Sequence, residues 1–239
     1  MTSSSSISTR AIDQARPEVL ATSPENRERH RERVLARFAL RATVRTVRLS
    51  SLPGAASWIH RSARVGFEVA FFAESSGGHR MTGHTTAVEG SSSWSTGYDV
   101  ALESTWATRS VRATTLGPGG LARLVLIRRS ESSWSVNGDV RADLDGCVDA
   151  DLESSAVTNT LPIHRLDFTP GEPVDVPAAF VRAEDLRVER LEQTYTLVGE
   201  TCQGIVFHYE SSTFGFECEL RYDVTGLIVD YPGIAVRHS

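Results

Sequence analysis

Polar side chains that could recognise a ligand are concentrated in residues 144–168, LDGCVDADLESSAVTNTLPIHRLDF. Asn159 and Arg165 could hold a sugar or phosphate headgroup through amide and bidentate guanidinium hydrogen bonds. Asp151 could then serve as the ion partner of the arginine. The structural alternative is that Asn159, which follows a cluster of small polar residues, bonds its own backbone in a turn. We favour this structural role over headgroup binding.

The aspartates of the same region could suggest a calcium site. Asp143, Asp145, Asp149 and Asp151 form an acidic series. A Ca²⁺ loop needs oxygen ligands that converge from a tight turn, whereas Asp149 and Asp151 are expected two positions apart on a strand. We therefore predict a solvated or arginine-paired strand face and no metal site. A carboxylate pair for glycoside hydrolysis stays open as an alternative.

Other catalytic constellations are absent from the sequence. Neither G-x-S-x-G nor H-E-x-x-H occurs. His79 and His84 are five residues apart, which places them on opposite faces of a strand, and we expect both to be exposed. Cys147, Cys202 and Cys218 lack the C-x-x-C spacing of a metal or redox motif, so we predict reduced, mostly buried thiols in the cytoplasm. The protein is predicted to be a non-enzyme without a cofactor.

The composition limits the possible partners. A formal net charge of -5 and a pI near 5.8 give no reason to expect nucleic acid. No run of about 18 apolar residues is present, so no transmembrane segment is expected. The polar N-terminus does not resemble a signal peptide.

Two parts of the chain differ in composition and in hydrophobic pattern. Residues 1–55 are predicted to be a disordered or short helical extension, since a Ser/Thr-rich start is followed by an arginine-rich stretch. Glutamates dilute the basic charge of that stretch, so we interpret it as a solvated helix rather than a lipid- or nucleic-acid-binding one. Residues 56–239 are predicted to be a single β domain, because short alternating runs are separated by turn signals.

The strands expected in this domain follow from period-two alternation. The dipeptide Asn137-Gly138 predicts a tight hairpin, and Pro162 is expected at a strand start, edge or bulge. The apolar run at 121–127 suggests burial on both faces. Strands are predicted at 66–73, 80–88, 97–109, 121–127, 134–136, 147–152, 158–163, 174–181, 186–191, 194–198, 205–209, 214–222 and 227–231.

Three sequence blocks carry a family resemblance. GCVDADL, TNTLPIHRL and VDYPG, in this order and spacing, resemble the bacterial family known as "Putative glycolipid-binding". The resemblance extends from about Trp58 to the C-terminus, and one departure is His164, where the family pattern usually has arginine. It implies a curved antiparallel sheet forming an open half-barrel, similar in shape to the bacterial lipoprotein localisation factors, with an apolar concave face.

The resemblance leads to a first hypothesis of non-enzymatic lipid or glycolipid binding. Tyr231 in the VDYPG block is interpreted as part of a rigid turn, with ligand binding as the alternative. An enzyme acting on a lipid or sugar derivative, and a pocketless structural or interaction module, are the alternative functions. The side chains expected to contact a lipid tail in the trough are Trp106, Phe207, Phe214, Phe216 and Tyr222.

Overall fold

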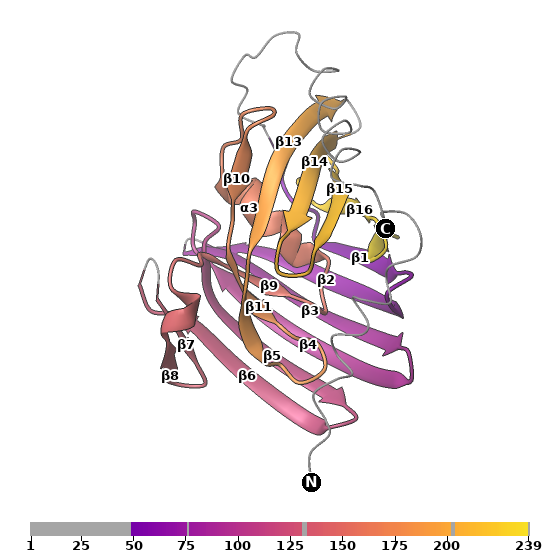
Figure 1. The fold of residues 1–239 in the computed structure, drawn as a ribbon, viewed down its shortest axis with the longest axis vertical. Helices are drawn as coiled ribbons and strands as arrows, with labels where there is room; N and C mark the ends of the chain where they lie inside the picture. The colour runs from indigo at the N-terminus through magenta and orange to yellow at the C-terminus, as the bar shows by residue number, and fades with distance from the viewer. Residues whose placement is uncertain (1–48, 76, 131–132, 202–203, 239) are drawn as a thin grey trace.

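One antiparallel sheet of 14 strands organises the chain (Figure 1). The computed structural model describes residues 49–75, 77–130, 133–201 and 204–238, so residues 1–48 of the predicted extension lie outside it. The strands of this sheet are β1 (Ala55–His60), β2 (Val65–Ser75), β3 (Gly78–Glu89), β4 (Ser92–Leu102), β5 (Thr108–Gly117), β6 (Gly120–Arg128), β7 (Trp134–Val136), β8 (Asp139–Arg141), β10 (Pro173–Asp175), β13 (Gln193–Thr201), β14 (Gly204–Ser211), β15 (Phe216–Tyr222), β16 (Ile228–Tyr231) and β17 (Ala235–Arg237).

The strand order explains why the sheet is open. It runs β10-β13-β14-β15-β16-β17-β1-β2-β3-β4-β5-β6-β7-β8, so β10 and β8 are its two edges. Pairing of β17 with β1 joins the C-terminal strands to the N-terminal meander. The sheet bends strongly, and β13 to β15 run at a steep angle to the N-terminal strands β2 to β6 (Figure 1). The predicted all-β fold with a curved, open antiparallel sheet is confirmed.

The long meander forms because its strands alternate. In β4, Tyr98, Val100 and Leu102 are buried on one face while the intervening side chains are partly exposed. The β7–β8 hairpin turns at Asn137 and Gly138, whose φ angles of 52° and 101° are those of the tight turn predicted there.

Two predictions for the meander are wrong. Residues 97–109 do not form one strand, because the chain turns between β4 and β5 and Trp106 adopts a φ of 69°. The β6 strand is not buried on both faces. Leu124 and Leu126 point into the core, but Val125 and Ile127 lie on the outer face with exposed fractions of 38% and 42%. Apolar residues on both faces of a strand therefore did not indicate burial here.

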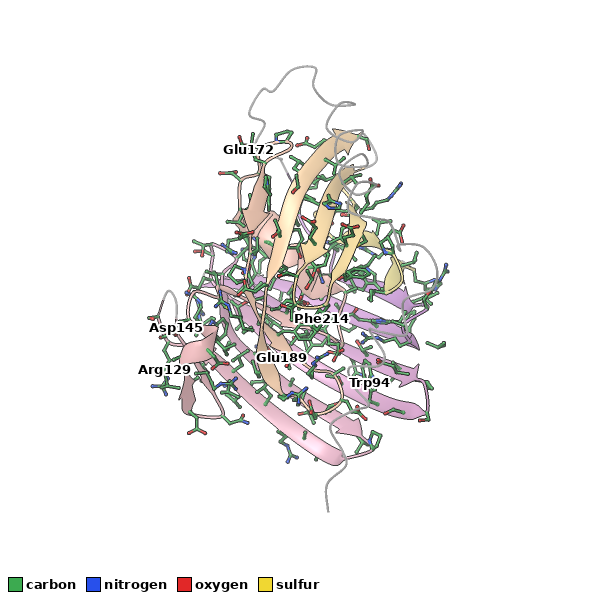
Figure 2. The ribbon with its side chains drawn as sticks, in the orientation of Figure 1. Trp94, Arg129, Asp145, Glu172, Glu189 and Phe214 are labelled. Atoms are coloured by element: carbon green, nitrogen blue, oxygen red, sulfur yellow. The ribbon has the colours of Figure 1, made fainter. Side chains whose placement is uncertain are left out.

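A central segment covers the concave face of the large sheet. It contains η1 (Ala142–Leu144), β9 (Asp149–Leu152), η2 (Val157–Asn159), α3 (Thr160–Arg165), β11 (Ala178–Val181) and β12 (Val188–Leu191). In its small sheet β9 pairs with β11 in parallel and β11 with β12 antiparallel. Hydrogen bonds join it to the meander, since Thr96 and Thr115 both donate to the carbonyl oxygen of Ala183. Figure 2 shows side chains filling the space between the two layers.

The second half of residues 144–168 is helical, so the strand predicted at 158–163 is wrong. Asn159 is the N-cap residue of α3, and Pro162 lies in the first turn. A proline is tolerated there because the first backbone N–H groups of a helix have no intrahelical acceptor. Among the described residues, no helix has the length and hydropathy needed to span a bilayer.

Candidate ligand-binding site

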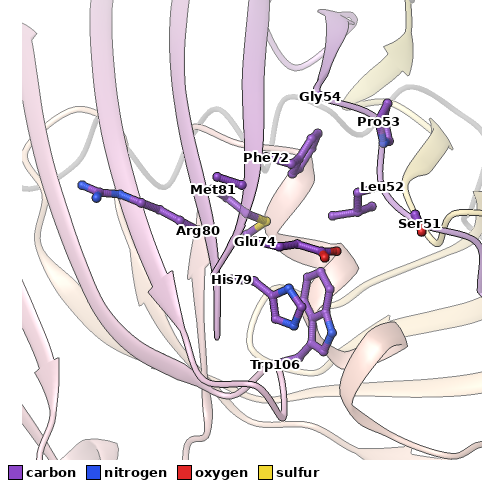
Figure 3. Close-up of a pocket in the computed structure, with 11 residues that line it drawn as sticks. Ser51, Leu52, Pro53, Gly54, Phe72, Glu74, His79, Arg80, Met81 and Trp106 are labelled. Carbon is purple, nitrogen blue, oxygen red and sulfur yellow. The ribbon is translucent and has the colours of Figure 1, made fainter. Parts of the chain in front are cut away.

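A pocket lies at the turn end of the β2–β3 hairpin (Figure 3). Phe72 pairs with Met81 and Glu74 with His79 across the two strands, so these four side chains share the inner face. The segment 51–54 runs over them, held where the Phe72 N–H donates to the Gly54 carbonyl oxygen at 3.1 Å. The cavity has a volume of about 210 Å³.

The pocket combines an apolar floor with a polar rim. Leu52, Phe72 and Met81 provide the apolar surface, and Met81 is fully buried. Glu74 and His79 supply polar groups at the rim, and His79 Nδ1 is buried without a hydrogen-bond partner among the described residues. Arg80 also lines the pocket but points away from it, because its guanidinium pairs with Asp99 on the outer face (Figure 3).

Trp106 closes one side of the pocket from the turn between β4 and β5. Its indole is stacked between two imidazoles, with ring centroids 4.2 Å from His79 and 3.9 Å from His164. Both faces of the indole are therefore covered, and a ligand could reach only its edge. The stack connects β3, the β4–β5 turn and helix α3, so the pocket wall depends on the position of the central segment.

The histidine on α3 remains neutral at physiological pH. Burial lowers the pKa of His164 to about 4, and a hydrogen bond with the Thr225 backbone opposes the shift only partly. Gly226 packs directly against this imidazole with a φ of 76°, and a Cβ there would lie 2.8 Å from His164 Nε2. The left-handed backbone and the close approach both require glycine at this position.

A buried carboxylate lies deeper in the same sheet face. Glu68 on β2 accepts hydrogen bonds from the Tyr98 hydroxyl at 2.6 Å, from the Ser155 hydroxyl and from the Ala156 N–H at 2.8 Å. All three donors are buried, and two of them belong to the central segment. The carboxylate therefore anchors the central segment to the meander, since a buried charge needs several donors to remain stable.

The aspartates of β9 form separate buried contacts. Arg165 donates two hydrogen bonds to Asp149, at 3.0 and 2.6 Å, and the Thr158 hydroxyl donates to Asp151 at 2.7 Å. Burial raises the pKa of Asp151 to about 6, the Thr158 hydrogen bond opposes the rise, and the neighbouring Asp149 carboxylate adds to it.

Comparison with known proteins agrees with this architecture. A family model described as "Putative glycolipid-binding" matches residues 55–237, which is most of the chain. The chain belongs to this family. No curated protein matches it.

One of two similar solved structures supports the fold of this family member. A DUF1089 family protein from Pseudomonas aeruginosa is similar, with a TM-score of 0.63 and 24% identity over 80% of this chain and 96% of that one. A beta-barrel-like protein of the DUF1849 family from Brucella abortus covers 79% of this chain and 95% of its own. Its TM-score is 0.48 and its sequence identity is 10%.

The polar candidates for headgroup recognition lie around α3, where Asp151 and Asn159 are buried and Arg165 is partly buried. Asp151 is not the ion partner of Arg165, because Asp149 occupies that position and Thr158 binds Asp151. Asn159 makes no side-chain capping bond. Its Oδ1 accepts from the Tyr195 hydroxyl at 2.9 Å, so its role is structural but not the predicted turn. The arginine pairing predicted for the acidic strand face is found at Asp149, but that face is buried and not solvated.

The aromatic candidates for ligand binding, which are the five predicted trough residues and Tyr231, separate into four groups. Phe207 and Tyr222 are fully buried in the main core, with exposed fractions of 0% and 1%. Phe216 and Tyr231 are partly buried and pack at the margin of that core, whereas Phe214 packs against Phe180 in a separate small cluster. Only Trp106 borders the pocket. The reason is that the chain's own central segment covers the concave face.

Several pocket residues were not found from the sequence. Alternation in β2 places Phe72 and Glu74 on one face, which the strand prediction for 66–73 implied in part. Nothing local indicates that residues 51–54 return over this strand end or that His79 stacks on Trp106. The two histidines lie on opposite faces of β3 as predicted, with His84 exposed beside Ser95, but His79 is not exposed.

Proposed function

We propose that this protein binds a lipid or glycolipid without transforming it, at the pocket of β2, β3, residues 51–54 and Trp106. An apolar segment of the ligand would lie against Leu52, Phe72 and Met81. Hydroxyl or other polar groups would meet Glu74 and His79 at the rim. The proposed ligand site is therefore at the turn end of the β2–β3 hairpin and not in the concave trough predicted from the sequence.

The observation that carries the proposal is an apolar floor and a polar rim in one cavity. Ligand sites commonly combine a mostly apolar lining with a few polar groups that fix orientation. The unpartnered Nδ1 of His79 supports a polar ligand group at the rim, because a buried polar atom is stabilised by a hydrogen bond. The name of the family points to the same ligand class.

The small volume limits what the pocket contributes to affinity. A volume of about 210 Å³ lies below the usual range of roughly 300–1,000 Å³ for small-molecule sites, so only part of a lipid would be enclosed. Burial of about four methylenes contributes about 3 kcal/mol. This apolar contribution is smaller than the binding free energy of a complex with a millimolar Kd, which is roughly 4 kcal/mol. Polar contacts at the rim must therefore add to the affinity.

Native mass spectrometry after incubation with a bacterial total lipid extract tests the proposal. The wild-type chain should carry a lipid or glycolipid adduct, and Phe72→Glu should lose it because a charge would enter the apolar floor. Phe71→Glu is the matched control, since Phe71 lies on the opposite face of the same strand and is 58% exposed. Equal uptake by Phe72→Glu, or none by the wild type, would refute the proposal. Circular dichroism must show that both variants are folded.

Incubation with the same lipid extract also tests whether the pocket is instead the active site of an enzyme. Ser51, Glu74 and His79 all line the pocket, and His79 could act as a general base in a lipid hydrolase. Our proposal predicts that extracted ligand has an unchanged mass after prolonged incubation. Products formed by the wild type but not by His79→Ala would establish the enzyme instead.

We also propose that the protein works in the cytoplasm. Cys147 and Cys218 are free, which supports a reducing compartment. Burial raises the pKa of Cys147 to about 11, so its thiol stays protonated and unreactive near neutral pH. Cys202 lies outside the described residues.

A further inference from the structure

Three metal-ligating side chains converge on the outer face of the β14–β15 hairpin. His208 and Glu210 are two positions apart on β14, opposite in parity to the buried Phe207 and Tyr209. Glu217 on β15 is directly across from Glu210. One ligand atom from each of the three side chains lies within 4.8 Å of the others, and His208 Nε2 is 3.8 Å from Glu210 Oε1.

The charge around these residues is not balanced by the protein. Glu210 and Glu217 form a directly opposed pair of like charges, which is destabilising in an antiparallel sheet. Glu219, the cross-strand neighbour of His208, adds a third carboxylate. Among the described residues, no arginine lies within ion-pair distance of these three glutamates. Other carboxylates of the chain, such as Glu153 beside Arg182, do have such a partner.

We propose that His208, Glu210 and Glu217 bind a divalent transition-metal ion, with Zn²⁺ as the best match. An imidazole nitrogen with carboxylate oxygens is a donor set typical of zinc, whereas Ca²⁺ and Mg²⁺ prefer oxygen alone. Tetrahedral bonds of about 2.1 Å place donors about 3.4 Å apart, so modest side-chain rotations would close the site. Three protein ligands leave a fourth position for water or a further ligand.

The accessibility of the site fits this role. The side chains of His208 and Glu210 are 29% and 51% exposed, so an ion can reach them and rotamer changes do not disturb the core. The site lies on β14 and β15 and shares no residue with the pocket of β2 and β3. Metal binding and lipid binding can therefore be tested separately.

Isothermal titration of the untagged full chain with Zn²⁺ is the direct test. We expect saturable binding of one ion at this site, and the Co²⁺-substituted protein should show visible d–d absorption. His208→Ala and Glu217→Gln should each weaken binding at least about tenfold. His84→Ala is the matched control, because His84 is an exposed histidine on the outer face of β3, and it should leave the titration unchanged.

Thermal unfolding provides a second readout. Zn²⁺ should raise the melting temperature of the wild type, because a ligand that binds the native state stabilises it. Without metal, Glu217→Gln should melt at or above the wild-type temperature since it removes the like-charge pair, and it should lose the response to Zn²⁺. The absence of saturable binding, or titrations of His208→Ala and Glu217→Gln that match the wild type, would overturn the proposal. Lipid uptake by these variants should not change.

Discussion

The buried Asp151 carboxylate makes the stability of the protein depend on pH in a defined direction. Its pKa is raised from the ordinary 3.8 to about 6, mainly by burial. A carboxyl whose pKa is higher in the folded state stabilises the protein below the unfolded pKa, and this contribution is lost as the pH rises through 6. The shift corresponds to about 3 kcal/mol at pH values above 7.

Asp151→Asn isolates this effect. The asparagine Oδ1 can still accept the Thr158 hydrogen bond of 2.7 Å, but it carries no charge to desolvate. The free energy of unfolding of the variant minus that of the wild type should therefore increase by up to about 3 kcal/mol as the pH is raised from 3.5 to 8.

Urea unfolding at several pH values measures this difference. Asp143→Asn provides a control of opposite sign, because Arg141 lowers the pKa of the exposed Asp143 carboxyl. That variant should lose relative stability as the pH rises through the acidic range. A difference between Asp151→Asn and the wild type that is the same at all pH values would refute the assignment.

Three further predictions concern the contacts that hold the pocket and the central segment. Because the pKa of His164 is lowered to about 4, its contribution to stability is present above pH 6.5 and lost as the pH falls through 4, so His164→Gln should flatten the melting temperature between pH 4 and 7. A Cβ on Gly83 would lie 2.2 Å from the Tyr98 hydroxyl oxygen, so Gly83→Ala should cost about 1–3 kcal/mol by urea unfolding. Arg165→Met leaves Asp149 buried without its ion pair and should cost about 3–5 kcal/mol at pH 7, less in acid where the carboxyl is protonated.

The strands could largely be predicted from the sequence because their pattern is local. Alternation located most of β2, β3, β6 and β13 to β16, and Asn137-Gly138 fixed the β7–β8 turn. The short strands β1 and β17 were missed, since each has few residues and they pair with one another from opposite ends of the chain. Helix α3 was missed because Pro162 was interpreted as a residue at a strand start, edge or bulge rather than in the first turn of a helix.

The candidate site was less predictable because its parts are distant in sequence. Residues 51–54, the β2–β3 hairpin and Trp106 meet only after the sheet has formed. The conspicuous polar residues of the central segment instead make buried contacts, such as Arg165 with Asp149 and Asn159 with Tyr195. Sequence pattern identified which face of each strand is apolar. It could not show that the central segment covers the concave face.

A fluorescence titration with n-octyl glucoside below its micelle concentration tests the binding proposal most directly. Trp106 is the one partly exposed tryptophan among the described residues, and it borders the pocket, so its emission should respond to a bound alkyl glycoside. We predict a saturable shift for the wild type and Phe71→Glu, and none for Phe72→Glu or for the wild type with glucose alone. A shift of the same size in Phe72→Glu, or no saturable shift in the wild type, would contradict binding at this pocket.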